Sequence, residues 1–338
     1  MESFVESKGG AIPKVATTLS LRDQLGTIGV RTGFTRNNYR VTPGLYCTGE
    51  PTKNSPVLVT ANYKLSFDCL RKELNQIPAW ILVVDTRGIN VWCASGKGTF
   101  SAEEVAYQVQ RAGLEKIVDH RKLILPQLCA NGVALHRLKE LCGFRGQFGP
   151  IKASALVDFI EIGTANETMR AITFSFSERA VLIPLEICML WKQLAVACVI
   201  FFLISGISSE IYSLSLSLQR TVPLMLATLL AIFSGAVLTP LLLPWIPFRQ
   251  FWLKGSLLGL ITGLFYLIFT QQGLSGVEKP GALLWMISCS SYLAMNFTGS
   301  TVFTSLSGVK EEMNKGLLLQ TIAAALALIL WIAAPFLH

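Results

Sequence analysis

Five long apolar runs in the second half of the chain constrain its fold more than any other feature. They cover residues 188–207, 222–243, 253–269, 282–302 and 317–337. A hydrocarbon core of roughly 30 Å is crossed by about 20 apolar residues of helix. The sequence therefore predicts an all-α transmembrane domain of five helices over residues 188–338. A membrane anchor is the simpler interpretation of this half, and transport is the alternative.

Charged residues are concentrated before these runs. The chain has 338 residues, is 51% hydrophobic and only 15% charged, and carries most of its 29 Lys/Arg and 21 Asp/Glu before residue 190. We therefore expect a soluble part ahead of the membrane domain. No Lys/Arg cluster with interleaved aromatic residues is present in the sequence, so the net charge of +8 favours contact with anionic lipid over nucleic acid.

Loop charges predict the orientation in the membrane. If the N-terminal part is cytoplasmic, the inner flanks carry more basic residues than the outer loops, as the positive-inside rule requires. The inner set is Arg179, Lys192, Arg249, Lys254, Lys310 and Lys315, and the outer set is Arg220 and Lys279. The N-terminus lacks the apolar core of a cleavable signal peptide. We expect a multi-pass protein of the cytoplasmic (inner) membrane with His338 outside.

Strands and helices alternate over residues 56–165. Strands are expected at 57–60 and 79–85, and helices at 64–76 and 101–112, the second with a capping box of Ser101 and Glu104. Two further strands, or one strand and a loop, are expected within 116–128, a helix at 132–143, and a turn and helix within 145–163. This order is typical of a Rossmann-like α/β fold with a parallel sheet and helices on both faces. Residues 1–55 are predicted to be an N-terminal extension, and 166–187 a linker.

Ligands in such folds bind outside the carboxyl ends of the strands. The loops after Thr60, Asp85 and Leu125 should therefore converge on one site. The second loop contains the segment NVWCASGKGTF, residues 90–100, with Cys93 between a tryptophan and a run of small residues. A strand is expected to end before this segment and a helix to begin after it.

Four interpretations of Cys93 compete. A nucleophile needs a histidine base, and only His120 or His136 could supply one. A redox thiol needs a partner, and none of the eight cysteines forms a CxxC pair. A phosphate loop requires glycine where Val91 stands. A core cysteine is the default. The small residues Ala94, Ser95, Gly96 and Gly98 beside Trp92 suggest a fifth possibility, a thiolate that faces a large planar cofactor.

The same segment carries a family resemblance. NVWCASGKGTF resembles the signature of the membrane-bound mercury-methylating corrinoid proteins. The resemblance extends to PVLVTANYKLSFD (56–68), LILPQL (123–128) and FGPIKASALVDF (148–159), and to the order of a soluble domain followed by five spans. The soluble domain is also similar to the corrinoid-binding domain of the corrinoid iron–sulfur protein.

The resemblance implies a corrinoid-dependent methyltransferase. It would transfer a methyl group from a methyl–Co(III) corrinoid to Hg(II), forming methylmercury, with the Cys93 thiolate as the catalytic residue and lower axial cobalt ligand. Asn90, Val91, Trp92, Ala94 and Ser95 would position this segment, while Thr60, Gly149 and Pro150 would approach the ring. An ordinary turn explains the last two residues equally well. Independently, no histidine here follows the Asp-x-His pattern of histidine-ligated corrinoid proteins.

The resemblance also implies partners. No cluster motif is present in the sequence, so electrons would come from a ferredoxin-like protein with two [4Fe–4S] clusters. The methyl group would come from methyltetrahydrofolate through another protein, and it would leave as a carbanion equivalent or a radical. Two alternatives remain open: a corrinoid methyl carrier for a different acceptor in one-carbon metabolism, and a membrane-anchored sensor without chemistry. Cys129 and Cys142 could hand over Hg(II), although buried, incidental thiols are expected.

Overall fold

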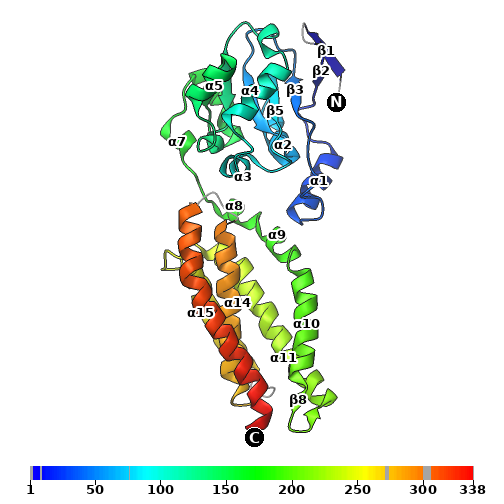
Figure 1. Cartoon of the computed structure of the whole chain (residues 1–338), viewed down its shortest axis with the longest axis vertical. Helices are drawn as coiled ribbons and strands as arrows, with labels where there is room; N and C mark the ends of the chain where they lie inside the picture. Colours follow the sequence, from blue (N-terminus) through cyan, green and yellow to red (C-terminus); the bar gives the residue numbers. More distant parts are fainter. Residues whose placement is uncertain (1–2, 8–9, 76, 271–273, 300–305, 338) are drawn as a thin grey trace. The chain divides into compact units, whose positions relative to one another are not determined.

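The structure is a computed structural model that describes residues 3–7, 10–75, 77–270, 274–299 and 306–337 (Figure 1). It divides into two compact units, Met1–Thr173 and Phe174–His338. These bounds differ from the predicted ones. The first unit includes both the predicted extension 1–55 and the start of the predicted linker 166–187. Gln76, the predicted helix end, residues 300–302 of a predicted span, and His338 lie outside the described residues.

A seven-stranded mixed sheet forms the centre of the first unit, in the order β1-β2-β3-β5-β4-β6-β7. The strands are β1 Ser3–Ser7, β2 Gly10–Lys14, β3 Gly44–Thr48, β4 Val57–Ala61, β5 Ala79–Val84, β6 Lys122–Leu125 and β7 Arg145–Phe148. The prediction of a parallel sheet is confirmed for β5, β4, β6 and β7. The predicted extension adds further strands to this sheet, since β3 pairs antiparallel with β5 and the sheet continues through β2 and β1.

Helices cover both faces of this sheet, as predicted. Leu82 and Val84 of β5 face a core shared with α4 and α5, while Ile81 and Val83 face a core shared with α2 and α6. This alternation follows from the two-residue period of a strand. The helices of the unit are α1 Leu21–Arg31, α2 Lys64–Lys72, α3 Val91–Gly96, α4 Ala102–Arg111, α5 Leu135–Cys142, α6 Leu156–Ile162 and α7 Glu167–Arg170.

Two local predictions need correction, and one open alternative is decided. Cys93 was expected in a loop, but it lies within the short helix α3. Within residues 116–128 the alternative of one strand and a loop is confirmed, because the strand is β6 and residues 117 and 118 follow a single helical turn, η1 Leu114–Lys116. Residues 145–148 were expected in a turn and form β7 instead, because they pair with β6. A four-residue strand with an exposed face carries too little local pattern to be distinguished from a turn.

In its described residues the second unit is helical except for one short hairpin, β8 Ile207–Ser208 and β9 Ile211–Tyr212. Its helices are α8 Phe176–Ala180, α9 Ile183–Cys188, α10 Trp191–Ser205, α11 Leu214–Ile232, the π-helical turn η4 Phe233–Leu238, α12 Thr239–Leu242, α13 Phe251–Phe269, α14 Glu278–Gly299 and α15 Leu306–Ala333. Among the described residues, three helices are long and apolar enough to cross a membrane: Leu214–Leu242, Phe251–Phe269 and Gly308–Phe336.

The five-span prediction stays a prediction for the other two runs. The first corresponds to α10, which reaches the length of a span only together with the preceding segment Phe176–Cys188, across a bend of 48°. The fourth corresponds to α14, which packs against both α13 and α15. Its buried face includes Ser288, Ser290 and Ser291, whose hydroxyls bond neighbouring helices. A helix enclosed by other helices does not need an apolar surface on every side.

Small residues at a four-residue spacing bring α13 close to α14. A Cβ added at Gly255 would lie 2.5 Å from the Ala294 Cβ, and one at Gly259 would lie 2.8 Å from the Ser290 Cβ. The close approach lets the Ser290 hydroxyl donate to the Gly255 carbonyl at 2.7 Å. The spacing therefore marks a helix–helix contact within the second unit.

Candidate cofactor-binding site

Asn90 fixes the start of the helix that carries Cys93. Its Oδ1 atom accepts a hydrogen bond from the backbone N–H of Cys93 at 2.8 Å, so Asn90 is the N-cap of α3. This bond satisfies one of the N–H groups that the first turn of a helix leaves without a partner. The predicted positioning role of Asn90 thus has a physical basis: the residue holds the backbone of Cys93 itself.

One face of α3 anchors it to the protein interior. Val91, Ala94 and Ser95 are buried, and the Ser95 hydroxyl donates to the Cys129 carbonyl at 3.3 Å. A Cβ added at Gly132 would lie 2.5 Å from the Ser95 Oγ. The small residues were expected to admit a large ligand, but at Ala94 and Ser95 the chain itself makes the close approach. These residues therefore hold α3 in place.

The opposite face of α3 is open. Trp92 and Cys93 are half-buried, and Gly96 and Lys97 are exposed. Within the described part of the chain, the Cys93 Sγ makes no hydrogen bond, whereas the Cys142 Sγ donates to the Leu138 carbonyl at 3.2 Å. A helix anchored on one side and presenting an unbonded thiol on the other can offer that thiol to a ligand without moving its backbone.

Asn62, which sequence reasoning missed, connects this helix to the end of β4. Its side chain is buried, and the Oδ1 accepts hydrogen bonds from the N–H groups of Thr86 and Gly88 at 3.1 and 2.9 Å. The Thr86 hydroxyl lies 2.8 Å from the same oxygen and 2.7 Å from the Ile89 carbonyl. Asn62 therefore organises the turn that leads from β5 into α3.

The turn is completed by Asp85. The Asn62 Nδ2 donates to the Asp85 Oδ1 at 3.0 Å, and the backbone N–H of Arg87 donates to the same oxygen at 2.9 Å. Arg87 and Gly88 both have left-handed backbones, with φ of 59° and 78°. A non-glycine residue in that region costs conformational energy and persists only where its surroundings enforce it. The side chains of Asn62 and Asp85 provide that enforcement.

Tyr63, next along the chain, is buried close to Cys93. Burial is the main cause that raises the pKa of Tyr63, and negative charge on the nearby Cys93 sulfur would raise it further. The arginines at positions 36 and 31 oppose it. The loop after α1 thus lies near the carboxyl edge of the sheet, at the same end as Cys93.

The other residues predicted to bind the ring lie along this edge. Thr60 is buried in β4, one residue before its end. Gly149 and Pro150 directly follow β7, and the Gly149 N–H donates to the Leu125 carbonyl at 2.8 Å. A Cβ at Gly149 would meet the Ile124 Cγ2 at 3.1 Å, so protein occupies the space on that side. Because parallel strands end at the same edge of a sheet, Thr60, Gly149 and Pro150 all lie at that edge. Their strands, β4 and β7, are at different distances from α3.

The structure separates His120 from Cys93. The His120 Nε2 lies 2.9 Å from the Ser55 carbonyl, and its Nδ1 accepts from the Lys122 N–H at 3.2 Å. These contacts place the ring at the amino ends of β4 and β6, whereas Cys93 follows the carboxyl end of β5. His136 is exposed at the start of α5. His120 is therefore not placed to act as a general base for Cys93, a role that the sequence had left open.

Two further cysteines of the first unit are less suited than Cys93 to bind a metal ion. Cys129 is fully buried in η2 Gln127–Cys129, and burial raises the pKa of its thiol to about 12. Burial also raises the pKa of Cys142. A thiol binds soft metals as the thiolate, so neither residue is well suited to pass Hg(II). Their interpretation as structural thiols is the better supported one.

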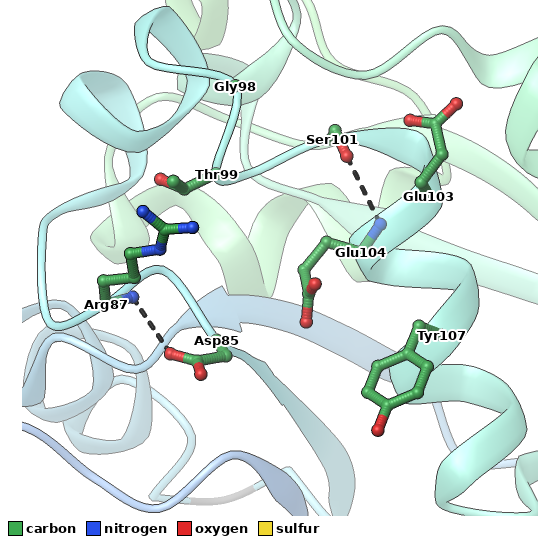
Figure 2. Close-up of a pocket in the computed structure, with 8 residues that line it drawn as sticks. All are labelled: Asp85, Arg87, Gly98, Thr99, Ser101, Glu103, Glu104 and Tyr107. Carbon is green, nitrogen blue, oxygen red and sulfur yellow. Dashed lines mark hydrogen bonds between the residues drawn. The ribbon is translucent and has the colours of Figure 1, made fainter.

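A polar hollow of about 340 Å³ adjoins the turn before α3. It is lined by Asp85, Arg87, Gly98, Thr99, Ser101, Glu103, Glu104 and Tyr107. Figure 2 shows that Arg87 extends toward Thr99 and that Glu103 points away from the other two acids. The carboxylates therefore do not converge on one point. The described residues contain no group of three His, Cys, Asp or Glu side chains that could hold a metal ion.

Comparison with known proteins finds similarity within the first unit. Residues 12–160 match the family described as CO dehydrogenase/acetyl-CoA synthase delta subunit. This match lies inside the first unit and spans its central sheet from β2 to α6. The chain is thus similar to this family over its α/β part.

Individual relatives show the same similarity. The acetyl-CoA decarbonylase/synthase complex subunit gamma of Methanopyrus kandleri is 34% identical over 128 residues, which are 37% of this chain and 27% of the relative. The corrinoid/iron-sulfur protein large subunit of Moorella thermoacetica is 33% identical over 129 residues, 38% of this chain and 28% of the relative. This chain therefore spans only about a quarter of the length of these curated relatives.

Proposed function

We propose that the first unit binds a corrinoid at the carboxyl edge of its parallel strands, with the Cys93 thiolate as the lower axial ligand of cobalt. The observation that carries the proposal is the two-sided character of α3. Its buried face is fixed by Val91, Ala94 and Ser95, and its open face presents a thiol with no hydrogen bond among the described residues. The names of the relatives, which include a corrinoid protein, support the same cofactor.

The residues at this edge are compatible with a large planar ligand. Trp92 beside Cys93 provides a half-buried aromatic surface, and Gly96 and Lys97 leave the next turn of α3 open. Asn90 and Asn62 keep the Cys93 backbone fixed through the N-cap and the turn. Thr60, Gly149 and Pro150 would line the same edge farther along the sheet. A fixed backbone is valuable for an axial ligand, because a preorganised ligand loses little freedom on binding.

The proposed activity is methyl transfer to Hg(II), which yields methylmercury. A bound corrinoid supplies a cobalt ion that can carry a methyl group. The Cys93 thiolate would donate charge to that metal, the main way in which an axial ligand tunes a cofactor. The segment 90–95 would hold the Cys93 thiolate in place, and Hg(II) would be the substrate that accepts the methyl group. The resemblance of NVWCASGKGTF to the mercury-methylating proteins supports this acceptor.

Partners and location follow from the same proposal. Electrons would come from a ferredoxin-like protein with two [4Fe–4S] clusters, and the methyl group from methyltetrahydrofolate through another protein. The second unit would anchor the protein in the cytoplasmic (inner) membrane, with the first unit in the cytoplasm. The three apolar helices support membrane insertion, and the excess of basic residues on the inner flanks supports the orientation.

A second function has its own support. The relatives named above belong to acetyl-CoA decarbonylase/synthase complexes and to a corrinoid/iron-sulfur protein, not to mercury-methylating enzymes. A membrane-anchored corrinoid methyl carrier for a different acceptor would therefore use the same site. The two functions share Cys93 and differ only in the acceptor.

Methyl transfer in membrane nanodiscs distinguishes them. The full chain, loaded with methylcobalamin, is given Hg(II) or a small thiol as acceptor in separate reactions. Mercury methylation predicts an initial rate at least about tenfold higher with Hg(II), and a loss of about a hundredfold or more in Cys93→Ala. A preference for the thiol acceptor establishes the carrier instead. An unchanged rate in Cys93→Ala contradicts both functions.

A further inference from the structure

We infer that α1 and the residue Phe34 form a docking surface for an anionic lipid bilayer. Leu21, Leu25 and Ile28 of α1 are 71%, 59% and 58% exposed, and Phe34 just beyond the helix is 84% exposed. We call these four residues the α1 stripe. Their spacing of four and three residues places the helical members on one face. Figure 1 shows α1 to one side of the sheet, away from α4 and α5.

The opposite face of α1 is attached to the first unit. Val30 is only 3% exposed and belongs to the main core. A Cβ added at Gly26 would lie 2.4 Å from the Tyr39 hydroxyl oxygen, so no side chain would fit there. The inward face of the helix is thus already packed, and the α1 stripe has no packing role among the described residues of this unit.

A cluster of charges holds α1 in this orientation. The two Asp23 carboxylate oxygens accept from the Lys64 Nζ at 2.5 Å and the Arg71 Nη2 at 2.9 Å, and both bases also bond Asp68. Burial alone would raise the pKa of Asp23, but the hydrogen bonds from Lys64 and Ser20 hold it well below the usual range. The α1 stripe is therefore presented by a helix that is tied firmly to α2.

The charges around the α1 stripe point to its occupant. Asp23 is the only acidic residue between positions 15 and 49, and it is directed into the cluster with Lys64 and Arg71. Arg22 directly follows Leu21 in α1, Arg36 lies two residues after Phe34, and both are exposed. Exposed apolar residues bordered only by basic ones are typical of helices that lie in the headgroup region of anionic bilayers.

The membrane is also the surface to which this unit is attached. The second unit, with its apolar helices, begins directly after Thr173. Covalent attachment to a membrane-embedded segment raises the local concentration of lipid, so a short stripe is sufficient for docking. The inference is independent of the proposed corrinoid site, since it uses neither Cys93 nor a cofactor.

Hydrogen exchange of the full chain in nanodiscs measures the docking. Amides of residues 21–34 should exchange about tenfold more slowly in phosphatidylglycerol-containing nanodiscs than in detergent, with a smaller effect in pure phosphatidylcholine. The double variant Leu25→Ser, Ile28→Ser should lose this protection. Phe4→Ser, which removes an exposed apolar side chain from β1, should retain it. Protection that does not depend on lipid overturns the inference.

Photo-crosslinking identifies the occupant directly. A benzoyl-phenylalanine at position 25, in nanodiscs without corrinoid, should yield a phospholipid adduct by mass spectrometry, and the same probe at position 4 should not. An adduct with peptides of this chain or of another protein would show that the stripe is a protein interface and would overturn the inference. An adduct that forms only after hydroxocobalamin is added, with loss of lipid adducts, would instead assign the stripe to the cofactor.

Discussion

Two short helical segments lie side by side at the carboxyl edge of the sheet, and each carries a cysteine. In α3, Cys93 is half-buried and its Sγ has no hydrogen bond among the described residues. In η2, Cys129 is fully buried beneath α3, and its carbonyl accepts from the Ser95 hydroxyl. The two residues carry the same chemical group. They differ as possible ligands because Cys93 lies on the open side of α3, whereas Cys129 lies on the buried side of the contact between α3 and η2.

Alkylation should show the largest difference between the two cysteines. Because burial raises the pKa of Cys129 from 9.0 to about 12, its thiolate fraction near about pH 8 is about a thousandfold lower than in an unfolded chain. Iodoacetamide should modify Cys93 rapidly and leave Cys129 intact until the unit unfolds. Peptide mass spectrometry of a time course measures both rates, and equal rates would refute the comparison.

The same pKa shift has a consequence for stability. A thiol with a raised pKa favours the folded state while it is protonated, so its contribution is complete below pH 9.0 and is lost between pH 9.0 and about 12. The free energy of unfolding should therefore fall across this window. Denaturation midpoints measured against pH test this, and Cys129→Ala should remove this part of the dependence.

Removal of the Asn62 side chain should have the next largest effect. Asn62→Ala leaves the buried N–H groups of Thr86 and Gly88 without their acceptor, at a cost of about 3 kcal/mol. Hydrogen exchange of these amides should accelerate about a hundredfold. The exposed Asn54, in the loop before β4, provides the control variant Asn54→Ala. Unchanged exchange in Asn62→Ala would mean that the turn into α3 does not depend on this side chain.

A methyl group added at Gly132, where the residues after η2 meet α3, should have a smaller effect on the free energy of unfolding. In Gly132→Ala the new methyl group would lie 2.5 Å from the Ser95 Oγ and 2.7 Å from the Phe100 carbonyl oxygen. Overpacking of this kind costs about 1–3 kcal/mol. Urea denaturation should show the loss, and Ser95→Gly should restore part of it. The exposed neighbour Asn131 is the control, and an equal loss in Asn131→Ala would argue against the close contact.

Loss of the α3 cap should have the smallest effect. Asn90→Ala removes one capping bond, worth about 1 kcal/mol, and Asn90→Gly should cost less. Because the cap bonds the Cys93 backbone, the alkylation rate of Cys93 should change as well. Ser101→Ala removes the equivalent cap of α4 and should lower stability without changing that rate. Equal changes in both variants would mean that Asn90 does not position Cys93.

Local sequence patterns predicted much of this edge. The apolar runs that form β4 and β5 have unambiguous boundaries, and the parallel arrangement follows from the alternation of strands and helices. The rule that ligands lie at the carboxyl ends of strands then placed the loop with Cys93 at the candidate site. The strands and their parallel pairing were predicted correctly because each step depends on residues close together in the chain.

Long-range partners could not be predicted. The main bonds of Asn62 go to residues 23–26 positions later, and a single asparagine after a strand has no distinctive pattern. An Asn directly after one buried strand, with Asp-Thr-Arg-Gly directly after the next, was the signal that could have found it. The strand β3 was missed for a related reason, since its partner β5 lies more than thirty positions away.

An absorption spectrum tests the central claim most directly. The full chain in nanodiscs is reconstituted with cobalamin, together with Cys93→Ala and the matched variant Cys129→Ala. If Cys93 is the axial ligand, the wild type and Cys129→Ala share a thiolate-perturbed spectrum, and Cys93→Ala loses it. If Cys93→Ala retains cobalamin with the wild-type spectrum, or if none of the three proteins retains cobalamin, the proposed role of Cys93 is wrong.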